Sequence, residues 1–146
     1  MPKVSIVIPT FNSSNYLKAT LDSVLSQTYT NWECILVDDG SEDLTETISI
    51  NYQEKDNRFQ LHKRPEDLPK GSSSARNYGV SHAKGDYLIF LDADDLWNEE
   101  KIEKQIRFMK DNGYEFTFTG YEFVDENGID NKKIVKVPEK INYRQA

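Results

Sequence analysis

The chain has 146 residues, of which 37% are apolar and 29% charged, and it carries a formal net charge of −7 at pH 7. This length suits one domain with a buried core, so a second full domain is not expected. The acidic balance argues against nucleic acid or an anionic membrane as a direct partner, because both need a basic surface to neutralise phosphates. An acidic protein can still hold a phosphate ligand through a metal ion or through backbone N–H groups at a helix start.

No stretch of the sequence approaches the roughly 20 apolar residues of a membrane span, and the apolar run 4–8 is too short for a signal peptide. We therefore expect a cytoplasmic chain. Peripheral association with the inner face of the membrane, through a partner or a missing segment, is left open. Cys34 is the single cysteine and lies in a strand-like apolar run, so we expect a small core residue in a reducing compartment.

The first third of the sequence predicts two strand–helix units. Residues 4–8 form a β-branched run closed by Pro9, which is typical of a strand buried on both faces. The polar cluster 12–15 offers N-cap oxygens for a helix whose apolar side chains have helical spacing. These are Leu17, Leu21, Val24 and Leu25. A second strand at 32–37 is followed by a helix that carries Leu44 and Ile48, with Ser41 as one candidate cap.

The middle of the sequence continues the alternation. Residues 59–62 predict a weak third strand, and the turn and cap residues 71–74 precede a short helix around 75–83. Residues 87–91 predict another buried strand. An amphipathic helix is expected at 98–111, capped by Asn98 and stopped by Gly113. Its buried stripe would be Ile102, Ile106 and Met109.

The last part is rich in aromatic residues and alternates imperfectly. Residues 114–124 predict an antiparallel or edge strand, and 134–137 could pair back as a hairpin around the turn 125–128. Alternating strands and helices give the fold class α/β, with a mostly parallel central sheet flanked by helices and a mixed C-terminal edge.

Polar residues follow three of the predicted strands at their carboxyl ends, where open parallel α/β sheets bind ligands. The first strand ends in residues 9–12 (PTFN), the second in 38–41 (DDGS) and the later one in 92–95 (DADD). Converging carboxylates repel one another unless a cation lies among them, and hard oxygen ligands favour Mg²⁺, Mn²⁺ or Ca²⁺ over Zn²⁺. Mg²⁺ is commonly held by one or two carboxylates and completed by substrate phosphates.

Aspartates at strand ends also have a purely structural explanation, because their side chains cap helices and close turns. Asp43 and Asp95 could do only that. Two acidic pairs, each placed directly after an apolar strand, favour the binding site. His62 and His82 have no partner at metal or triad spacing in the sequence, so we expect them at the surface.

Five motifs in order and spacing make the chain resemble family 2 glycosyltransferases, which have the Rossmann-like GT-A fold. They are residues 4–12 (VSIVIPTFN), 23–28 (SVLSQT), 37–41 (VDDGS), 75–79 (ARNYG) and 85–95 (GDYLIFLDADD). The resemblance runs from about residue 3 to about residue 112. It implies one nucleotide-sugar-binding GT-A domain over 1–146, truncated before the acceptor-binding region, since complete members are usually well over 200 residues long.

The resemblance also implies roles for single residues. Pro9, Thr10 and Phe11 match the wall around the base and ribose, and Asp39, with Asp38 beside it, matches the carboxylate that reads the base or ribose. Asp92 and Asp94 match the Asp-x-Asp motif. Asp94 is expected to bind the metal, Mn²⁺ or Mg²⁺, and Asp92 is expected near the ribose and diphosphate and as a second candidate metal ligand. Arg76 has two readings of equal weight, a basic contact to the nucleotide sugar or to the acidic cluster, and a salt bridge that fixes its loop.

The implied reaction transfers a sugar, with inversion, from a nucleoside diphosphate donor to an acceptor hydroxyl. UDP-sugars are the favoured donors, the acceptor would be a glycan or lipid-linked, and the setting would be cell-surface polysaccharide or glycan synthesis. The general base is expected outside this chain, since nothing marks one of the later acidic residues for that role. These are Glu115, Glu122, Asp125 and Glu126.

Two alternatives stay open at this point. A donor-binding fragment without turnover would follow from the missing acceptor half. A nucleotidyltransferase ranks third, because residues 10–14 contain neither the glycine nor the basic residue that a triphosphate loop needs.

Overall fold

The computed structural model describes residues 1–125, 127 and 130–137. The chain divides into two compact units, Met1–Lys104 and Gln105–Ala146. Among the described residues, no helix is long and apolar enough to cross a membrane.

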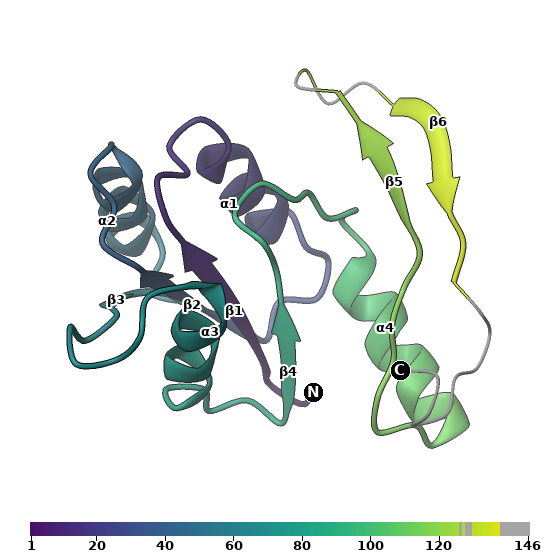
Figure 1. Cartoon of the computed structure of the whole chain (residues 1–146). Helices are drawn as coiled ribbons and strands as arrows, with labels where there is room; N and C mark the ends of the chain where they lie inside the picture. Colours follow the sequence, from purple (N-terminus) through teal and green to yellow (C-terminus); the bar gives the residue numbers. More distant parts are fainter. Residues whose placement is uncertain (126, 128–129, 138–146) are drawn as a thin grey trace. The chain divides into compact units, whose positions relative to one another are not determined.

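The first unit contains a four-stranded sheet in the order β3-β2-β1-β4 (Figure 1). Its strands are β1 (Val4–Thr10), β2 (Trp32–Asp38), β3 (Phe59–Lys63) and β4 (Tyr87–Phe90). Each neighbouring pair is parallel, which confirms the predicted α/β class with a mostly parallel central sheet. The strand order runs outward from β1 in both directions, so the reversal that creates a ligand crevice lies at β1.

Helices cover both faces of this sheet. The helix α3 (Ser72–Val80) packs through Ala75 and Gly79 on the face that carries Val7 and Val37. The helix α2 (Thr45–Lys55) packs on the opposite face, where its Tyr52 ring meets Phe59 edge to face at 5.5 Å between centroids.

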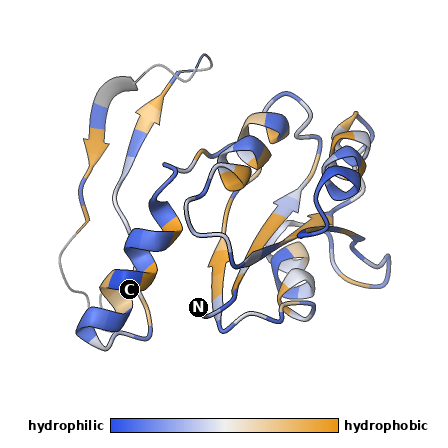
Figure 2. Ribbon diagram, turned by 180° about the vertical axis from the view of Figure 1, so that it is seen from behind, coloured by the Kyte–Doolittle hydropathy of each residue, from blue (hydrophilic) through white to orange (hydrophobic). Residues whose placement is uncertain are grey.

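The helix α1 (Leu17–Leu25) lies beside α2. The Tyr52 hydroxyl of α2 donates a hydrogen bond to the Lys18 carbonyl of α1 at 3.3 Å. Figure 2 shows hydrophobic residues running along the strands and polar residues in the loops between them.

Pro9 does not close the first strand as the sequence predicts. The strand β1 continues to Thr10, and Pro9 pairs with Val37 of β2. The strand β4 ends at Phe90 opposite Val7, so β1 has a neighbour on only one side at Pro9. A proline is tolerated there because fewer ladder hydrogen bonds are required of it.

The predicted caps of two helices, α1 and α2, are wrong. The helix α1 begins after Tyr16 and α2 after Leu44, and neither N-cap makes a side-chain capping bond. The Asn12 side chain instead accepts the Glu42 N–H at 2.9 Å, and the Ser41 hydroxyl accepts the Asn12 N–H at 3.0 Å. These polar side chains join two loops to each other, a tertiary contact that competes with local capping.

The helix α4 (Lys101–Asn112) begins later than predicted. Asn98 accepts the Glu100 N–H at 3.1 Å in the turn before it. The helix ends as predicted at Gly113, whose φ of +66° suits a glycine after a helix. The predicted stripe of Ile102, Ile106 and Met109 is buried.

The second unit contains an antiparallel pair, β5 (Tyr121–Val124) and β6 (Asp130–Val135). The predicted hairpin is therefore confirmed, and it forms a two-stranded sheet of its own. The predicted strand at 114–124 is shortened to its last four residues. Three positions of the predicted turn and its flank, 126, 128 and 129, lie outside the described residues.

Candidate functional site: the carboxyl ends of three parallel strands

The first acidic pair begins with Asp38, whose carboxylate closes the turn after β2. Asp38 is buried and accepts hydrogen bonds from the backbone N–H groups of Gly40 at 3.2 Å and Ser41 at 2.9 Å. It also accepts from the hydroxyls of Thr10 at 3.2 Å and of Ser41. These contacts hold the ends of β1 and β2 together, so Asp38 fixes the backbone on which the site is built.

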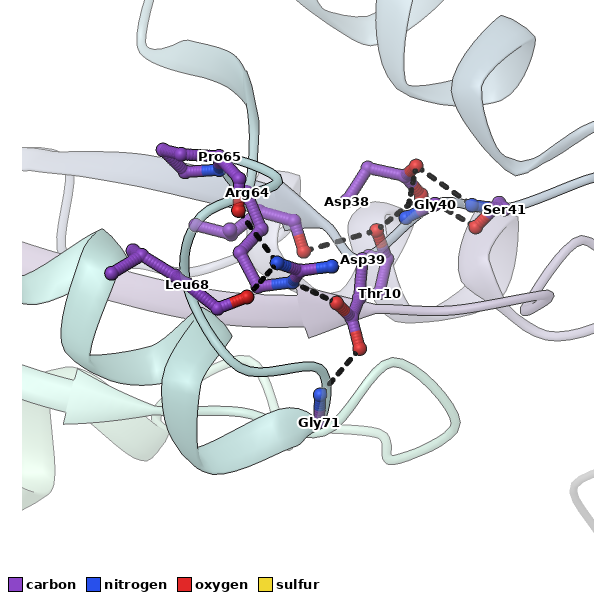
Figure 3. A network of polar contacts seen from close by, with 10 residues as sticks. Thr10, Asp38, Asp39, Gly40, Ser41, Arg64, Pro65, Leu68 and Gly71 are labelled. Atoms are coloured by element: carbon purple, nitrogen blue, oxygen red, sulfur yellow. Dashed lines mark hydrogen bonds and ion pairs between the residues drawn. The ribbon is translucent and has the colours of Figure 1, made fainter.

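The second member of the pair, Asp39, connects β2 to the start of α3. Its carboxylate accepts a hydrogen bond from Nε of Arg64 and another from the Gly71 N–H at 2.8 Å (Figure 3). Only 10% of the Asp39 side chain and 6% of the Arg64 side chain are exposed. Sequence reasoning did not find Arg64, although an arginine two residues after a predicted strand and directly before a proline was the available signal.

The loop after β1 presents Phe11 to solvent. Phe11 is 59% exposed, whereas Thr10 before it is buried. Asn12 has a φ of +46°, a left-handed conformation that asparagine adopts more readily than most residues. The Asn12 N–H donates to the Ser41 hydroxyl at 3.0 Å, which fixes this loop against the loop after β2. Pro9, Thr10 and Phe11 thus lie at the strand ends, as predicted.

The Asp-x-Asp motif follows β4, and its first carboxylate is paired. Arg76 of α3 donates from Nη2 to Asp92. This ion pair fits both readings of Arg76, a contact with the acidic cluster and a salt bridge that fixes its loop. Arg76 is placed by close helix packing, since a Cβ on Gly79 would lie 2.5 Å from Cγ1 of Val7. The glycine of the ARNYG motif therefore brings α3, and Arg76 with it, near the sheet.

The second carboxylate of the motif, Asp94, is exposed to solvent, and Asp95 follows it. Partial burial of the Asp95 carboxyl, and then the negative charges of Asp94 and Asp92, raise the pKa of Asp95 above its ordinary value. This region therefore has a negative potential that a cation would relieve.

The backbone of the Asp-x-Asp loop is anchored to α1 and to the residues after it. The Thr20 hydroxyl donates to the Ala93 carbonyl at 2.9 Å, and the Ser23 hydroxyl accepts the Trp97 N–H at 3.2 Å. The buried Gln27 side chain donates to the Asn98 carbonyl at 2.7 Å. The contacts of Ser23 and Gln27 explain the SVLSQT motif, to which sequence reasoning gave no role. It holds the loop that carries Asp92 and Asp94.

The donor atoms at the Asp-x-Asp loop fit a hard divalent cation. Among the described residues, no group of three or more histidine, cysteine or acidic side chains is arranged to hold a metal ion. Mg²⁺ and Mn²⁺ accept carboxylate and phosphate oxygens, and Mg²⁺ is commonly bound by one or two carboxylates together with substrate phosphates. Asp94, exposed and next to Asp92, can supply such a ligand.

Two predictions concern residues outside this site. Cys34 is fully buried, as expected. His62 and His82 were expected at the surface; both are partly buried, and their rings lie 4.1 Å apart between centroids. Burial and the neighbouring His82 lower the pKa of His62. His62 belongs to β3 and His82 follows α3, so the contact joins two segments that no local pattern connects.

The geometry above agrees with a match to a protein family. The family model described as Glycosyl transferase family 2 matches residues 5–145. The chain belongs to glycosyltransferase family 2. Among solved structures, this family 2 chain is similar to S. aureus TarS 1-349 in complex with UDP-GlcNAc, with a TM-score of 0.68 and 28% identity. That similarity covers 76% of this chain and 32% of the TarS 1-349 chain, and the fold is GT-A.

Two curated bacterial relatives are similar over almost the whole chain. A Bacillus subtilis (strain 168) protein, TuaG, whose name connects it with teichuronic acid biosynthesis, is 38% identical over 145 residues, which are 99% of this chain and 57% of that protein. The Escherichia coli UDP-Glc:alpha-D-GlcNAc-diphosphoundecaprenol beta-1,3-glucosyltransferase WfgD is 37% identical over 142 residues, 97% of this chain and 54% of that protein. The family 2 chain therefore spans about half the length of these relatives.

Proposed function

We propose that this chain is the donor-binding domain of an inverting glycosyltransferase that takes its sugar from a nucleoside diphosphate donor, with UDP favoured. The observation that carries the proposal is the convergence of three strand ends, Thr10 with Phe11, Asp38 with Asp39, and Asp92 with Asp94, beside the reversal of strand order at β1. Ligands of open α/β sheets bind at this position.

Each of these residues has a proposed task. Phe11 offers an exposed ring against which a base can stack, and Asp39 offers lone pairs that accept hydrogen bonds from the base or ribose. Asp92, held by Arg76, would lie beside the ribose and diphosphate, and Asp94 would bind the metal, Mn²⁺ or Mg²⁺. Pro9, Thr10 and Asp38 form the wall that holds these groups in place.

The reaction divides between this domain and the rest of the enzyme. A bound divalent metal would neutralise the charge that develops on the departing nucleoside diphosphate. This chain's residues bind and orient the donor. The general base that deprotonates the acceptor hydroxyl is proposed to lie outside these 146 residues, since the relatives are about twice as long.

The acceptor is proposed to be a glycan or a lipid-linked sugar in cell-surface polysaccharide synthesis. The name of WfgD specifies a diphosphoundecaprenol-linked acceptor, and the name of TuaG refers to teichuronic acid. An enzyme that uses lipid-linked acceptors would work in the cytoplasm at the inner face of the membrane, and we propose peripheral association through segments outside this chain.

The proposal is tested by calorimetric titration of UDP, GDP, CDP and dTDP, each with and without Mn²⁺. We expect UDP to bind in the presence of Mn²⁺ and the affinity to fall at least tenfold in Asp94→Asn, because one charged metal ligand is lost. Glu54→Gln, which removes an exposed carboxylate from α2, is the matched control and should bind like the wild type. If no nucleotide binds, or if binding is indifferent to Mn²⁺ and to Asp94→Asn, the proposed site is wrong.

A second candidate is a donor-binding fragment without turnover, which the half-length match to the relatives favours. Assays of donor hydrolysis and of sugar transfer to a lipid-linked acceptor, made on the 146-residue chain alone, test whether it turns over. Binding of UDP with neither reaction supports the fragment. Transfer by the 146-residue chain would instead place the general base within it.

A further inference from the structure

Arg64 is a buried arginine that the proposed donor site does not yet use. It follows β3, and its backbone N–H donates to the Asp38 carbonyl at 2.9 Å. Its Nε donates to Asp39, and its Nη1 donates to the carbonyl oxygens of Pro65, at 2.6 Å, and of Leu68. One side chain thus joins the carboxylate at the end of β2 to the backbone of the loop 65–70.

The loop closed by Arg64 leads directly back to the same carboxylate. After Leu68, the chain reaches Gly71, whose N–H donates to the other oxygen of Asp39 at 2.8 Å (Figure 3). Gly71 has a φ of +121°, which other residues rarely adopt, and it begins α3. Asp39 is therefore held from two sides, and its carboxylate cannot rotate without breaking a charge-assisted hydrogen bond.

We propose that Arg64 is a positioning residue that gives the donor site its preference for uracil over cytosine. The inference rests on the proposed function, in which Asp39 reads the base. Each carboxylate oxygen has two lone pairs, so Asp39 can still accept a hydrogen bond from a ligand after pairing with Arg64 and Gly71.

Fixing the carboxylate matters because the two pyrimidines differ at one edge. A fixed acceptor opposite position 3 of the ring meets an N–H group in uracil and a lone pair in cytosine, so it attracts the first base and repels the second. A carboxylate that can swing would instead reach the 4-amino group of cytosine. Arg64 therefore acts through Asp39, and its loss should reduce selectivity more than it reduces binding of the diphosphate.

The test compares Arg64→Lys with the wild type by calorimetry, using UDP, CDP and pyrophosphate, each with Mn²⁺. Lysine keeps the positive charge but lacks the planar fork that bonds the carboxylate and two carbonyls at once. In Arg64→Lys we expect the UDP affinity to fall about tenfold or more, the UDP-to-CDP affinity ratio to approach one, and the pyrophosphate affinity to stay unchanged. Arg58→Lys is the matched control, since Arg58 also pairs with an aspartate, Asp56, but lies over Trp32.

Several outcomes would overturn this role. A wild-type-like UDP-to-CDP ratio in Arg64→Lys, or an equal loss of UDP and pyrophosphate binding, would show that Arg64 serves stability alone. A wild type that binds UDP and CDP equally well would refute the selectivity while leaving the donor site intact. A wild type that binds neither pyrophosphate nor any nucleotide would refute the proposed function itself.

A measurement on the wild type covers the case in which Arg64→Lys does not fold. The Nε–H of Arg64 can be followed by ¹⁵N NMR of arginine side chains. Saturation with UDP and Mn²⁺ should shift this signal and slow its hydrogen exchange, whereas pyrophosphate and Mn²⁺ should leave it unchanged. An Nε–H signal that responds equally to both ligands, or to neither, contradicts the positioning role.

Discussion

Replacing Gly79 by alanine tests how the packing of α3 supports the site. A Cβ at this position would lie 2.5 Å from Cγ1 and 3.5 Å from Cγ2 of Val7, and 3.1 Å from Cγ2 of Val37. Both valines are fully buried in the sheet, so neither can move aside cheaply. Overpacking of this kind costs typically about 1–3 kcal/mol, and alanine returns about 1 kcal/mol of helix propensity.

We place the steric cost near its upper end, because two buried β-branched side chains line the site, and expect a net loss of about 2 kcal/mol in the free energy of unfolding. For a chain of this size that corresponds to a decrease of roughly 4–8 °C in Tm. Urea and thermal unfolding followed by circular dichroism would measure both quantities. Asn77→Ala, at an exposed position of the same helix, is the control and should be neutral or slightly stabilising.

The same substitution should also weaken nucleotide binding. Gly71 and Arg76 both belong to the start or body of α3 and contact Asp39 and Asp92. Moving the helix outward lengthens both contacts, so the UDP affinity should fall with the stability. A Gly79→Ala variant as stable as the wild type, or one that loses stability but binds UDP unchanged, would refute this coupling between helix packing and the site.

Three further predictions concern single side chains. Burial raises the pKa of Glu33, but hydrogen bonds from Lys3, Ser5 and the Lys84 N–H outweigh it and hold the pKa below its ordinary value of 4.5. Glu33→Gln should therefore lower the free energy of unfolding in urea by about 2 kcal/mol at pH 7. The difference between Glu33→Gln and the wild type should shrink as the pH falls below its ordinary pKa of 4.5. A loss of stability that is independent of pH would contradict this. Asp95 has a raised pKa, so Asp95→Asn should raise Tm at pH 7, and this gain should vanish as the pH falls toward 3.8; a lower Tm at pH 7 would contradict it. Phe11→Ala should change the unfolding free energy by less than about 0.5 kcal/mol. It should weaken UDP binding about tenfold, because base stacking is worth about 1–3 kcal/mol. Phe108→Ala, which removes another exposed ring, is the control and should leave the unfolding free energy and the UDP affinity almost unchanged.

The strands and the acidic pairs could be predicted because their signals are local. A β-branched run such as residues 4–8 indicates a buried strand by itself, and the acids at 38–39 and 92–95 follow their strands directly. Family motifs then supplied the expected roles. The cation-favouring potential at Asp94 needed no long-range contact to be foreseen.

The remaining features depend on contacts between distant segments. Arg64 reaches Asp39 only because β3 lies beside β2 and the loop 65–70 folds back, which sequence spacing does not specify. Asn12 and Ser41 were expected as caps but bond across two loops. The pairing of His62 with His82 likewise follows from the position of α3 on the sheet.

The central claim is that a metal-assisted nucleotide site lies at the carboxyl ends of β1, β2 and β4. Paramagnetic broadening of amide signals by Mn²⁺ in the presence of UDP locates the metal directly. We predict strong broadening at residues 92–95 and weaker broadening around Asp39 and Thr10, with Val4, Trp32 and Tyr87 at the amino ends of the strands unaffected. Broadening centred on the amino ends, or the same weak broadening throughout the chain, would contradict the site.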